Sequence, residues 1–572
     1  MRLCSLARKS CVPAVAALAA GVALSACGTA TPSGGQGANN GGSAPSSSGG
    51  GTSGSGSVLT AATNGSGPWS PVFNPFSPSY NYAFGFGAVY EPLYMFNDAT
   101  NKNEPWLATA FHWSDGGKTI TFAIRKGVTW SNGKPFTPAD VAFTFKLENK
   151  INSENNATSG NAQVAVHGDN VSLTYGSPQY VNFDQIAYNT PMVPPFTFAK
   201  VGDPLKFEDT HPIGTGPFVL KSQTPQYITY TKNPHYWQKG EPKISTVRDV
   251  SADSNSTMEA LLIAHKIQYS GVFTSDIKRT FADRAPTQNI VYTPALGTIS
   301  LALNLSNPMF QSVALRRGIS EAIDRTQLSN IGESGAEPPV SPTGLAGSVA
   351  QRAIESKWAK PISQNVSAAL ATLKQGGYSY AGGKLTAHGS SQQVAFSLEY
   401  PSSYSDWMTD CQLLQNDMSK IGIKLSCNGV SYQRFTADTS TGKYAATFDT
   451  ATGPNPYQEL NQVFAVGAGG LPKLGQSNNN ENIERFDDPT AAKALATLAN
   501  TNPSDTAATQ KQEDILEQIM VQQVPVIPLF ASTYHADFVN GPLTGWPTNS
   551  NPYLCVACYA AQEQLLLNAH KG

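Results

Sequence analysis

An apolar run close to the N-terminus indicates the compartment in which this chain folds. Arg2, Arg8 and Lys9 precede an Ala-rich apolar run of 13 residues, from Val12 to Leu24. A permanent membrane-spanning helix needs about 20 apolar residues, so this run is too short to stay in a bilayer. A positive start followed by a short apolar run is typical of a secretory signal peptide. The sequence therefore predicts that residues 1–26 direct export and that the rest folds outside the cytoplasm.

The residues after the apolar run predict a lipid anchor and a tether. Leu24-Ser25-Ala26-Cys27 resembles the bacterial lipobox, in which small residues precede a cysteine that is lipidated and becomes the new N-terminus. The alternative is an ordinary signal peptide with a coincidental cysteine. Residues 28–57 contain 11 Gly and 8 Ser and no charged or aromatic residue. Such a segment behaves as a flexible coil, so we expect residues 27–57 to tether a globular body to the outer face of the cell membrane by its lipid alone.

The composition favours a large folded body with an uncharged polar surface. Only 14% of the 572 residues are charged and 40% are apolar, whereas a typical soluble domain has about 25% charged residues. At about 150 residues per domain, this length predicts three to four structural units. The formal net charge is −2, and removal of residues 1–26 would lower it to −5. No basic excess is available to neutralise phosphates, which argues against a nucleic-acid partner.

Four cysteines remain beyond Cys27, and an even number in an exported chain favours two disulfides. Four cysteines allow three connectivities, of which sequence proximity favours Cys411 with Cys427 and Cys555 with Cys558. A four-cysteine zinc site is the alternative, but Cys411 and Cys427 do not form the close-spaced pair that such sites use. We therefore expect disulfides and no metal ion.

Predicted strands and helices alternate along the body of the chain. Residues 119–125 alternate polar and apolar side chains, as in a half-buried strand. An Asn-Gly turn at 131–134 follows, and a helix then opens at 137–140, with Thr137 as its cap. Further strands are expected at 218–221, 423–425 and 445–448, and an apolar run covers 524–529. Helices are expected at 312–328 and at 406–421, the second capped by Ser405. This alternation predicts α/β lobes.

A search for catalytic and cofactor motifs gives no match. The eight histidines include no pair four residues apart, so the HExxH zinc helix is missing, as is the G-x-S-x-G nucleophile turn. The glycines near 127–134 and 214–216 fit neither a phosphate loop nor a dinucleotide-binding fingerprint. We therefore expect neither an enzyme nor a cofactor. A triad assembled from distant residues would escape such a search, so a secreted hydrolase stays as an alternative of another class.

Several segments, taken in order, resemble one protein family. They are residues 89–93, 106–108, 113–118, 121–141, 214–218, 233–237, 316–325 and 524–529. The chain is similar in these segments to the extracellular solute-binding proteins of family 5, the oligopeptide- and dipeptide-binding lipoproteins of ABC importers. Only the block between 106 and 141 is specific by itself, whereas the ordered set behind a lipobox is highly specific. Most of these residues serve turns, caps and packing, so they identify the family better than they locate a site.

The resemblance implies a two-lobed periplasmic-binding-protein-like fold of type II, cluster C, with an extra small domain packed on lobe I. Lobe I would comprise 58–90, 213–297 and 531–572, the small domain 91–212 and lobe II 298–530. Two hinge strands would pass near 295–300 and 528–534. A monomer would close on a solute between its lobes and deliver it to the transmembrane subunits of an ABC permease.

Ligand sites in open α/β lobes lie beyond the carboxyl ends of strands and at helix N-termini. Segments expected at such places supply the candidate ligand-binding residues, with aromatic and neutral polar side chains that suit a peptide or a sugar. For each of them a packing or capping role is the alternative. The candidates are Phe73, Asn74, Trp407, Tyr432, Asp449, Thr450, Thr452, Asn455, Tyr457 and Phe530.

One departure from the family pattern bears on the ligand. Oligopeptide-binding relatives often carry an Asp-Tyr pair shortly before the proline of the loop near 450, and that carboxylate pairs with the α-ammonium of the peptide. Here Thr452-Gly453-Pro454-Asn455 stands in its place, with Asp449 nearby. Burying an unpaired ammonium costs several kcal/mol. Asp449 or another acid therefore takes the role, or the ligand is a neutral solute such as an oligosaccharide.

Oligopeptide import is thus the leading prediction for the function. Import of a neutral oligosaccharide or other solute is the runner-up. A surface sensor or adhesin with the same fold is a further alternative that the sequence does not separate from import.

Overall fold

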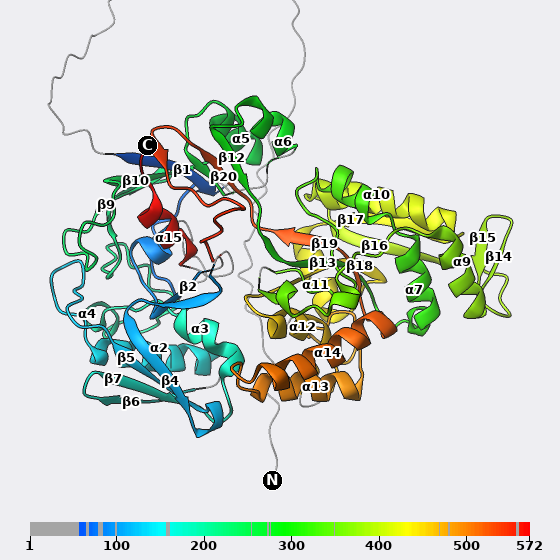
Figure 1. Cartoon of the computed structure of the whole chain (residues 1–572), viewed down its shortest axis with the longest axis horizontal. Coiled ribbons are helices and arrows are strands. Elements are labelled where there is room, and N and C mark those ends of the chain that lie inside the picture. The colour runs from blue at the N-terminus through cyan, green and yellow to red at the C-terminus, as the bar shows by residue number, and fades with distance from the viewer. Residues whose placement is uncertain are drawn as a thin grey trace, which may run out of the picture. The chain divides into compact units, whose positions relative to one another are not determined.

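The computed structural model describes most of the chain beyond the tether (Figure 1). The predicted signal peptide 1–26, Cys27 and the linker up to residue 56 lie outside the described residues. Among the described residues, no helix has both the length and the apolar character that a membrane span requires. The described residues are 57–64, 68–77, 84–97, 100–155, 161–252, 254–271, 274, 276–347, 349–467, 470–478, 481–555 and 560–572.

The largest sheet has seven strands in the order β12-β20-β11-β1-β10-β9-β8. Strand β1 runs parallel to β10 and β11, and the other neighbours are antiparallel. Leu59, Ala61 and Ala62 of β1 are fully buried, because a central strand is covered on both faces. The strands are β1 Val58–Asn64, β8 Phe218–Thr224, β9 Tyr227–Lys232, β10 Thr246–Ser251, β11 Tyr269–Ser270, β12 Asn289–Tyr292 and β20 Ala536–Val539. The same segments of chain contribute α1 Gly85–Ala88, α5 Asn255–Ile263, α6 Ile277–Thr280, α15 Ala561–Asn568 and the small pair β21 Leu543–Thr544 and β22 His570–Lys571.

A four-stranded antiparallel sheet, in the order β4-β5-β7-β6, is built from residues between 91 and 212. The predicted strand at 119–125 is β5, and its Ile120, Phe122 and Ile124 are buried. The predicted turn and helix are confirmed as well, because Gly133 adopts φ +82° and a helix begins at Pro138. The elements are β2 Tyr94–Asn97, β3 Lys102–Pro105, β4 Ala108–Ser114, β5 Thr119–Ile124, α2 Pro138–Asn155, β6 Gln163–His167, β7 Asn170–Thr174, α3 Phe183–Ala187 and α4 Pro195–Phe198.

A five-stranded mixed sheet has the order β17-β16-β18-β13-β19. Strand β16 is parallel to β17 and β18, whereas β13 is antiparallel to β18 and β19. With helices between these strands, the α/β class expected from the sequence is confirmed. The strands are β13 Ala295–Leu303, β16 Ala395–Pro401, β17 Lys424–Val430, β18 Ala446–Thr452 and β19 Ile527–Thr533, besides the hairpin β14 Ser379–Ala381 and β15 Lys384–Thr386. The helices are α7 Val313–Ala322, α8 Arg325–Gln327, α9 Val366–Gln375, α10 Ser405–Lys420, α11 Tyr432–Thr441, α12 Pro456–Phe464, α13 Pro489–Asn500 and α14 Thr506–Gln523.

The chain passes between the seven-stranded and five-stranded sheets at two neighbouring places. It leaves the first sheet between β12 and β13 and returns to it between β19 and β20 (Figure 1). The two crossings are paired, because Ala295 of β13 faces Thr533 of β19 in the antiparallel ladder. The Glu337 carboxylate accepts hydrogen bonds from the Thr533 backbone N–H and hydroxyl, both at 3.2 Å. The crossing is thus a hydrogen-bonded double strand.

Two helix predictions need correction. The single helix expected at 312–328 ends at Ala322, because Ile323 is extended and Asp324 caps a new short helix by accepting from the Gln327 N–H at 3.0 Å. A π-helical turn over Leu328–Gly332 follows. Ser405 is not a cap either: the N-cap position belongs to Tyr404, which has no side-chain capping bond, and Ser405 is the first helical residue.

One strand prediction also needs correction. The strand expected at 445–448 runs on through Thr452, so Thr450 and Thr452 lie inside it. Within the apolar run at 524–529, Val524 ends α14 in a left-handed conformation, and β19 begins at Ile527 and continues to Thr533.

The buried carboxylate of Glu91 gathers donors from distant parts of the chain. Glu91 is fully buried, and its Oε1 accepts from Trp106 Nε1 at 2.8 Å, Tyr236 OH at 3.2 Å and Trp237 Nε1 at 3.0 Å. Glu563 of α15 accepts from Trp106 and Tyr236 as well, at 3.2 and 3.3 Å. Burial, and then the charge of Glu91, raise the pKa of Glu563 well above its usual range. Two buried carboxyl groups thus connect four segments.

Gly214 allows the turn at 213–217 to approach the backbone beside Glu91. The Gly216 N–H donates to the Val89 carbonyl oxygen at 2.9 Å, and a Cβ on Gly214 would lie 1.7 Å from the same oxygen. The clash is with backbone, which has little freedom to move away. A close approach therefore requires glycine here.

We predict that Gly214→Ala destabilises the protein by about 1–3 kcal/mol, the usual cost of overpacking. Calorimetry should show a melting temperature several degrees lower. Gly176→Ala is the matched control, because a Cβ at Gly176 would have nothing within 4 Å. Equal melting temperatures for the two variants would contradict this account of the turn.

Candidate functional site

The carboxyl ends of three parallel strands meet at one edge of the five-stranded sheet. Strands β16, β17 and β18 end at Pro401, Val430 and Thr452, and helices α10, α11 and α12 begin within five residues of those ends. Helix α11 is capped by Ser431, whose hydroxyl accepts from the Arg434 N–H, and α12 by Asn455, whose carbonyl accepts from the Gln458 N–H. Ligand sites in open α/β folds lie at such an edge.

A cavity of about 340 Å³ opens at this edge, and we call it the Asp449 pocket. Its volume lies within the range usual for small-ligand sites, roughly 300–1,000 Å³. Helices α10 and α11, strand β18 and the last turn of α12 contribute its walls. Its lining residues are Tyr404, Trp407, Tyr432, Phe435, Thr436, Thr439, Phe448, Asp449, Thr450, Gln462 and Ile483.

Five aromatic rings form a continuous wall in the Asp449 pocket. Trp407 is central, with ring centroids 5.1 Å from Tyr404, 5.1 Å from Phe448 and 6.0 Å from Phe435. Tyr432 extends the wall outward, 6.4 Å from Phe435, and is 53% exposed. A buried ring that holds an exposed one in place gives a preformed surface on which a ligand can stack.

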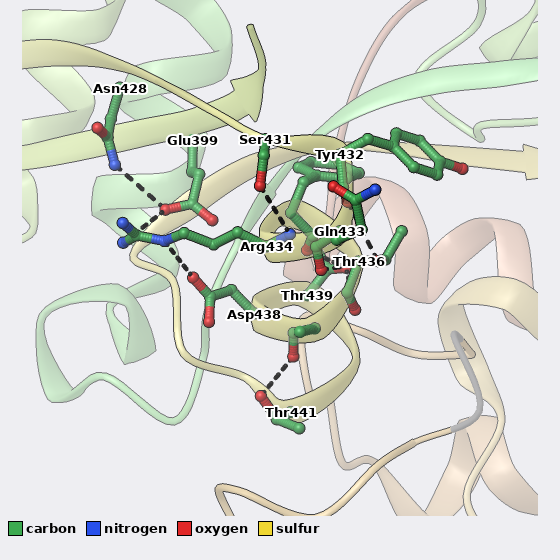
Figure 2. Close-up of polar contacts among 12 residues, drawn as sticks. Glu399, Asn428, Ser431, Tyr432, Gln433, Arg434, Thr436, Asp438, Thr439 and Thr441 are labelled. Atoms are coloured by element: carbon green, nitrogen blue, oxygen red, sulfur yellow. Dashed lines mark hydrogen bonds and ion pairs between the residues drawn. The ribbon is translucent and has the colours of Figure 1, made fainter. Parts of the chain in front are cut away.

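Helix α11 is fixed by charge on the side away from that wall (Figure 2). Arg434 donates through Nε to Asp438 Oδ2 at 3.0 Å and forms an ion pair with Glu399 Oε2 of β16 at 3.7 Å. Asn428 of β17 donates to the same Glu399 oxygen at 3.2 Å. Figure 2 shows the Tyr432 ring pointing away from these groups. One face of α11 is therefore bonded to the sheet through Arg434 and Glu399, and the other face lines the pocket.

Asp449 is the carboxyl group that lines this pocket. Burial raises its pKa to about 7, and its one favourable contact is the Thr450 backbone N–H. Among the described residues, no Lys, Arg or His forms an ion pair with it. Behind it lies the fully buried Glu484, whose pKa is raised well above its usual range by burial and then by the Asp449 charge. Asp449 thus titrates near neutrality without a fixed counter-cation in the described chain.

The structure brings together four of the residues selected from the sequence: Trp407, Tyr432, Asp449 and Thr450. Sequence reasoning missed Tyr404, Phe435 and Phe448. The available signal was the spacing of aromatic residues, because Tyr404 with Trp407 and Tyr432 with Phe435 are three apart at the starts of two helices.

The other candidates lie elsewhere. Phe530 is fully buried in the core of the five-stranded sheet, against which Tyr457 also packs, and Thr452 ends β18 half-buried. Phe73 is buried in the core of the seven-stranded sheet. Asn74 is fully buried, and its side-chain amide donates to the backbone oxygens of Pro204 and Phe207 at 2.6 and 2.7 Å. The side-chain amide of Asn74 thus holds the loop at residues 204–207.

Asn455 lines a second and larger cavity, of about 630 Å³, which we call the Asp184 cavity. Its walls come from residues 96–188 on one side and, on the other, from Val349, from Pro454 and Asn455 just before α12, and from the α13–α14 loop. Gln458 of α12 crosses between these walls and donates to Asp184 Oδ2 at 2.8 Å. This cavity shares no residue with the Asp449 pocket.

The cysteines and acids show no metal centre in the described part of the chain. Cys411 of α10 and Cys427 of β17 form a disulfide, Cys555 is disulfide-bonded too, and Cys558 lies outside the described residues. No group of three or more His, Cys, Asp or Glu among the described residues is arranged to hold a metal ion.

Comparisons with sequences of known proteins agree with this architecture. The nickel-binding periplasmic protein of Escherichia coli K12 is 25% identical over 400 residues, which cover 67% of this chain and 74% of that protein. The glutathione-binding protein GsiB of Salmonella choleraesuis is 25% identical over 244 residues, so the chain spans about half the length of that relative (46%) and the match covers 41% of this chain.

Solved structures show the same fold. The periplasmic oligopeptide-binding protein of an oligopeptide ABC transporter from Thermotoga maritima superposes with a TM-score of 0.81 at 21% identity, covering 90% of this chain and 99% of that one. A mannohexaose-bound structure of that protein superposes with a TM-score of 0.72 at 21% identity, covering 91% and 99%. The two-lobed periplasmic-binding fold expected from the sequence is therefore confirmed.

The family model described as bacterial extracellular solute-binding proteins, family 5 Middle, matches residues 102–470, more than half of the chain. With the fold and the edge-of-sheet pocket in place, this match shows that the chain belongs to the bacterial extracellular solute-binding proteins of family 5.

Proposed function

We propose that this chain is the extracytoplasmic substrate-binding protein of an ABC importer and that it captures oligopeptides for delivery to a permease. The observation that carries the proposal is Asp449, a carboxyl group that lines the same pocket as the aromatic wall and has no counter-cation among the described residues. An oligopeptide brings an ammonium for such a group and a backbone and side chains for the rings. The solute is released unchanged, so no catalytic residue is assigned.

We propose the lobes as 58–90, 213–297 and 531–572 for lobe I, 91–212 for the small domain and 298–530 for lobe II. The core of the five-stranded sheet lies within 298–530 and supports lobe II as a separate part. The four-stranded sheet has a core of its own, whereas Leu147, Ile151, Val193 and Phe198 of the small domain pack in the core of the seven-stranded sheet, as expected for a domain packed on lobe I. The paired crossings at β13 and β19 would act as the hinge. Solute that contacts both lobes would shift the population towards the closed form, which a permease would recognise in a monomer of this chain.

Asp449 gives the proposal a pH signature. A carboxyl with a pKa of about 7 is protonated at lower pH and then no longer attracts an ammonium. The ammonium of a peptide has a pKa of about 7.7–8.0, so it is charged throughout the range below pH 7.5. We therefore predict that a pentapeptide with a free N-terminus binds about 20-fold more weakly at pH 5.5 than at pH 7.5, by isothermal titration calorimetry.

The controls for this prediction separate the ion pair from general effects of pH. Asp449→Asn should weaken binding at pH 7.5 and flatten the pH profile, and the N-acetylated pentapeptide should show a flat profile with the unmodified protein. Asp438→Asn changes a carboxylate on the opposite face of α11 and should leave the profile intact. Equal affinity for free and acetylated peptides, with no effect of Asp449→Asn, would contradict the pairing of Asp449 with the peptide ammonium, and failure of both peptides to bind would contradict the oligopeptide proposal.

A neutral oligosaccharide is the second candidate solute. The aromatic wall favours it, since rings stack on sugars as well as on peptides, and the Thermotoga relative has been crystallised with mannohexaose. Acetylated peptides that fail to bind, together with hexasaccharide binding that is independent of Asp449, would decide for this alternative.

We also propose that Cys27 carries the lipid that anchors the protein, with residues 27–57 as the tether. Its place directly after the apolar run supports this proposal. We predict that cells grown with radiolabelled palmitate label the unmodified protein, that Cys27→Ser abolishes the label, and that the variant appears in the culture medium. Cys4→Ser is the matched control, because Cys4 would leave with the signal peptide. Persistent labelling of Cys27→Ser would contradict the anchor.

A further inference from the structure

The described body of the chain begins at one end of the seven-stranded sheet. Ser57 directly precedes β1, and Val58 at the start of β1 is paired with Thr246 at the start of β10. Thr246 is paired in turn with Thr231 near the end of β9, which runs antiparallel to β10. The starts of β1 and β10 and the end of β9 therefore share this end of the sheet.

Two further segments reach the same end. Gln268, just before β11, donates its backbone N–H to the Thr60 carbonyl oxygen at 2.7 Å, and Val539 at the end of β20 donates to Gln268 at 3.0 Å. The chain turns after Val539, and the C-terminal Gly572 donates to the Pro542 carbonyl oxygen at 3.4 Å. Figure 1 shows the C-terminus beside the start of β1. The turn before β11 and the C-terminal segment thus lie with the start of β1.

Lysines are the main charged residues of these segments, which comprise residues 232–245, 264–268 and 570–572. Glu241 is ion-paired with Lys243 at 3.0 Å, and the other acid there is the C-terminal carboxylate. Among the described residues, Lys232, Lys239 and Lys266 form no ion pair with a carboxylate. We call this surface the lysine end, and its exposed cations are Lys232, Lys239, Lys243, Lys266 and Lys571.

The opposite end of the same sheet has no such charges. The paired crossings to β13 and from β19 leave from that end, because they follow β12 and precede β20. None of the described residues at that end is Lys, Arg, Asp or Glu; they are 62–64, 224–227, 251–252, 270–271, 292–295 and 534–536. The positive charge thus lies where the chain enters the sheet and away from the crossings.

Charge and chain length both point to an anionic membrane as the partner of the lysine end. Without residues 1–26 the net charge is −5, so an anionic surface repels the chain as a whole unless a positive surface faces it. Residues 28–57 carry no charge and add no attraction of their own. A coil of about 30 Gly/Ser-rich residues spans about 30 Å, so a lipid at Cys27 would keep the lysine end close to the headgroups.

We propose that the lysine end docks on the anionic headgroups of the membrane to which the chain is tethered, and so sets the resting orientation of the body. In this orientation the paired crossings at β13 and β19 face away from the lipid. Attraction of exposed lysines to a membrane is weak and reversible at physiological salt, so docking does not prevent release towards a permease. The inference does not depend on which solute binds, although the nearness of the membrane rests on the anchor proposed at Cys27.

The test is co-sedimentation with vesicles, using the Cys27→Ser chain so that no attached lipid contributes. At an ionic strength of about 0.01 M, we expect binding to vesicles of equimolar phosphatidylglycerol and phosphatidylcholine and none to phosphatidylcholine alone. Each lysine near an anionic surface strengthens binding about fivefold, so Lys239→Gln combined with Lys266→Gln should weaken it about 20-fold. Raising the ionic strength to about 1 M, where the Debye length is about 3 Å, should abolish binding.

The matched control is Lys384→Gln combined with Lys424→Gln, which removes the same charge from exposed lysines of β15 and β17. It should weaken vesicle binding by less than threefold. Equal binding to the two kinds of vesicle would overturn the proposal, and so would equal losses in the two double variants. Failure of palmitate labelling at Cys27, with vesicle binding intact, would overturn the anchor and leave the lysine end standing.

Discussion

The buried carboxylate of Glu91 is the constraint on which the first half of this structure depends. A buried charge costs far more than a buried amide unless donors surround it. Here the donors are the indole N–H groups of Trp106 and Trp237 and the hydroxyl of Tyr236. Since they follow β3 and β9, Glu91 is satisfied only when segments far apart in sequence have assembled. Glu563 of α15 accepts from two of the same donors and so brings the C-terminal segment to the same point. Segments that are far apart in the sequence are thus held together by the hydrogen bonds to Glu91 and Glu563.

The parts of the fold that the sequence predicts are those with strong local signals. The strand at β5, the Asn-Gly turn and the helix opening at Pro138 each rest on residues within a few positions of one another. The failures occur where a distant partner decides. Asp324 interrupts the helix expected at 312–328, because its backbone N–H is held by Asp417 of α10 at 2.8 Å, nearly a hundred positions away. The length of β18 is likewise set by its pairing with β13 as far as Gly297. Periodicity contains no information about such partners.

The same contrast between local signals and distant partners applies to the candidate site. Trp407, Tyr432, Asp449 and Thr450 could be selected because the edge of a sheet collects the residues that follow parallel strands. Phe73, Asn74 and Phe530 satisfy the same local rule, but tertiary packing turns them into core or loop supports. Of the residues that line the Asp184 cavity, only Asn455 was selected from the sequence, because the two walls come from residues near 100–190 and near 455 and 504. Only the folded chain brings the two walls together.

The antiparallel pairing of Ala295 with Thr533 has a further consequence. Directly opposed residues of antiparallel strands have Cα atoms only about 5 Å apart, so the whole stretch from 296 to 532 departs from and returns to nearly one point. Topologically, it is an insertion that joins the remaining polypeptide through a two-stranded stem. The gap between the two strand ends is short enough for a tight hairpin of two residues to span.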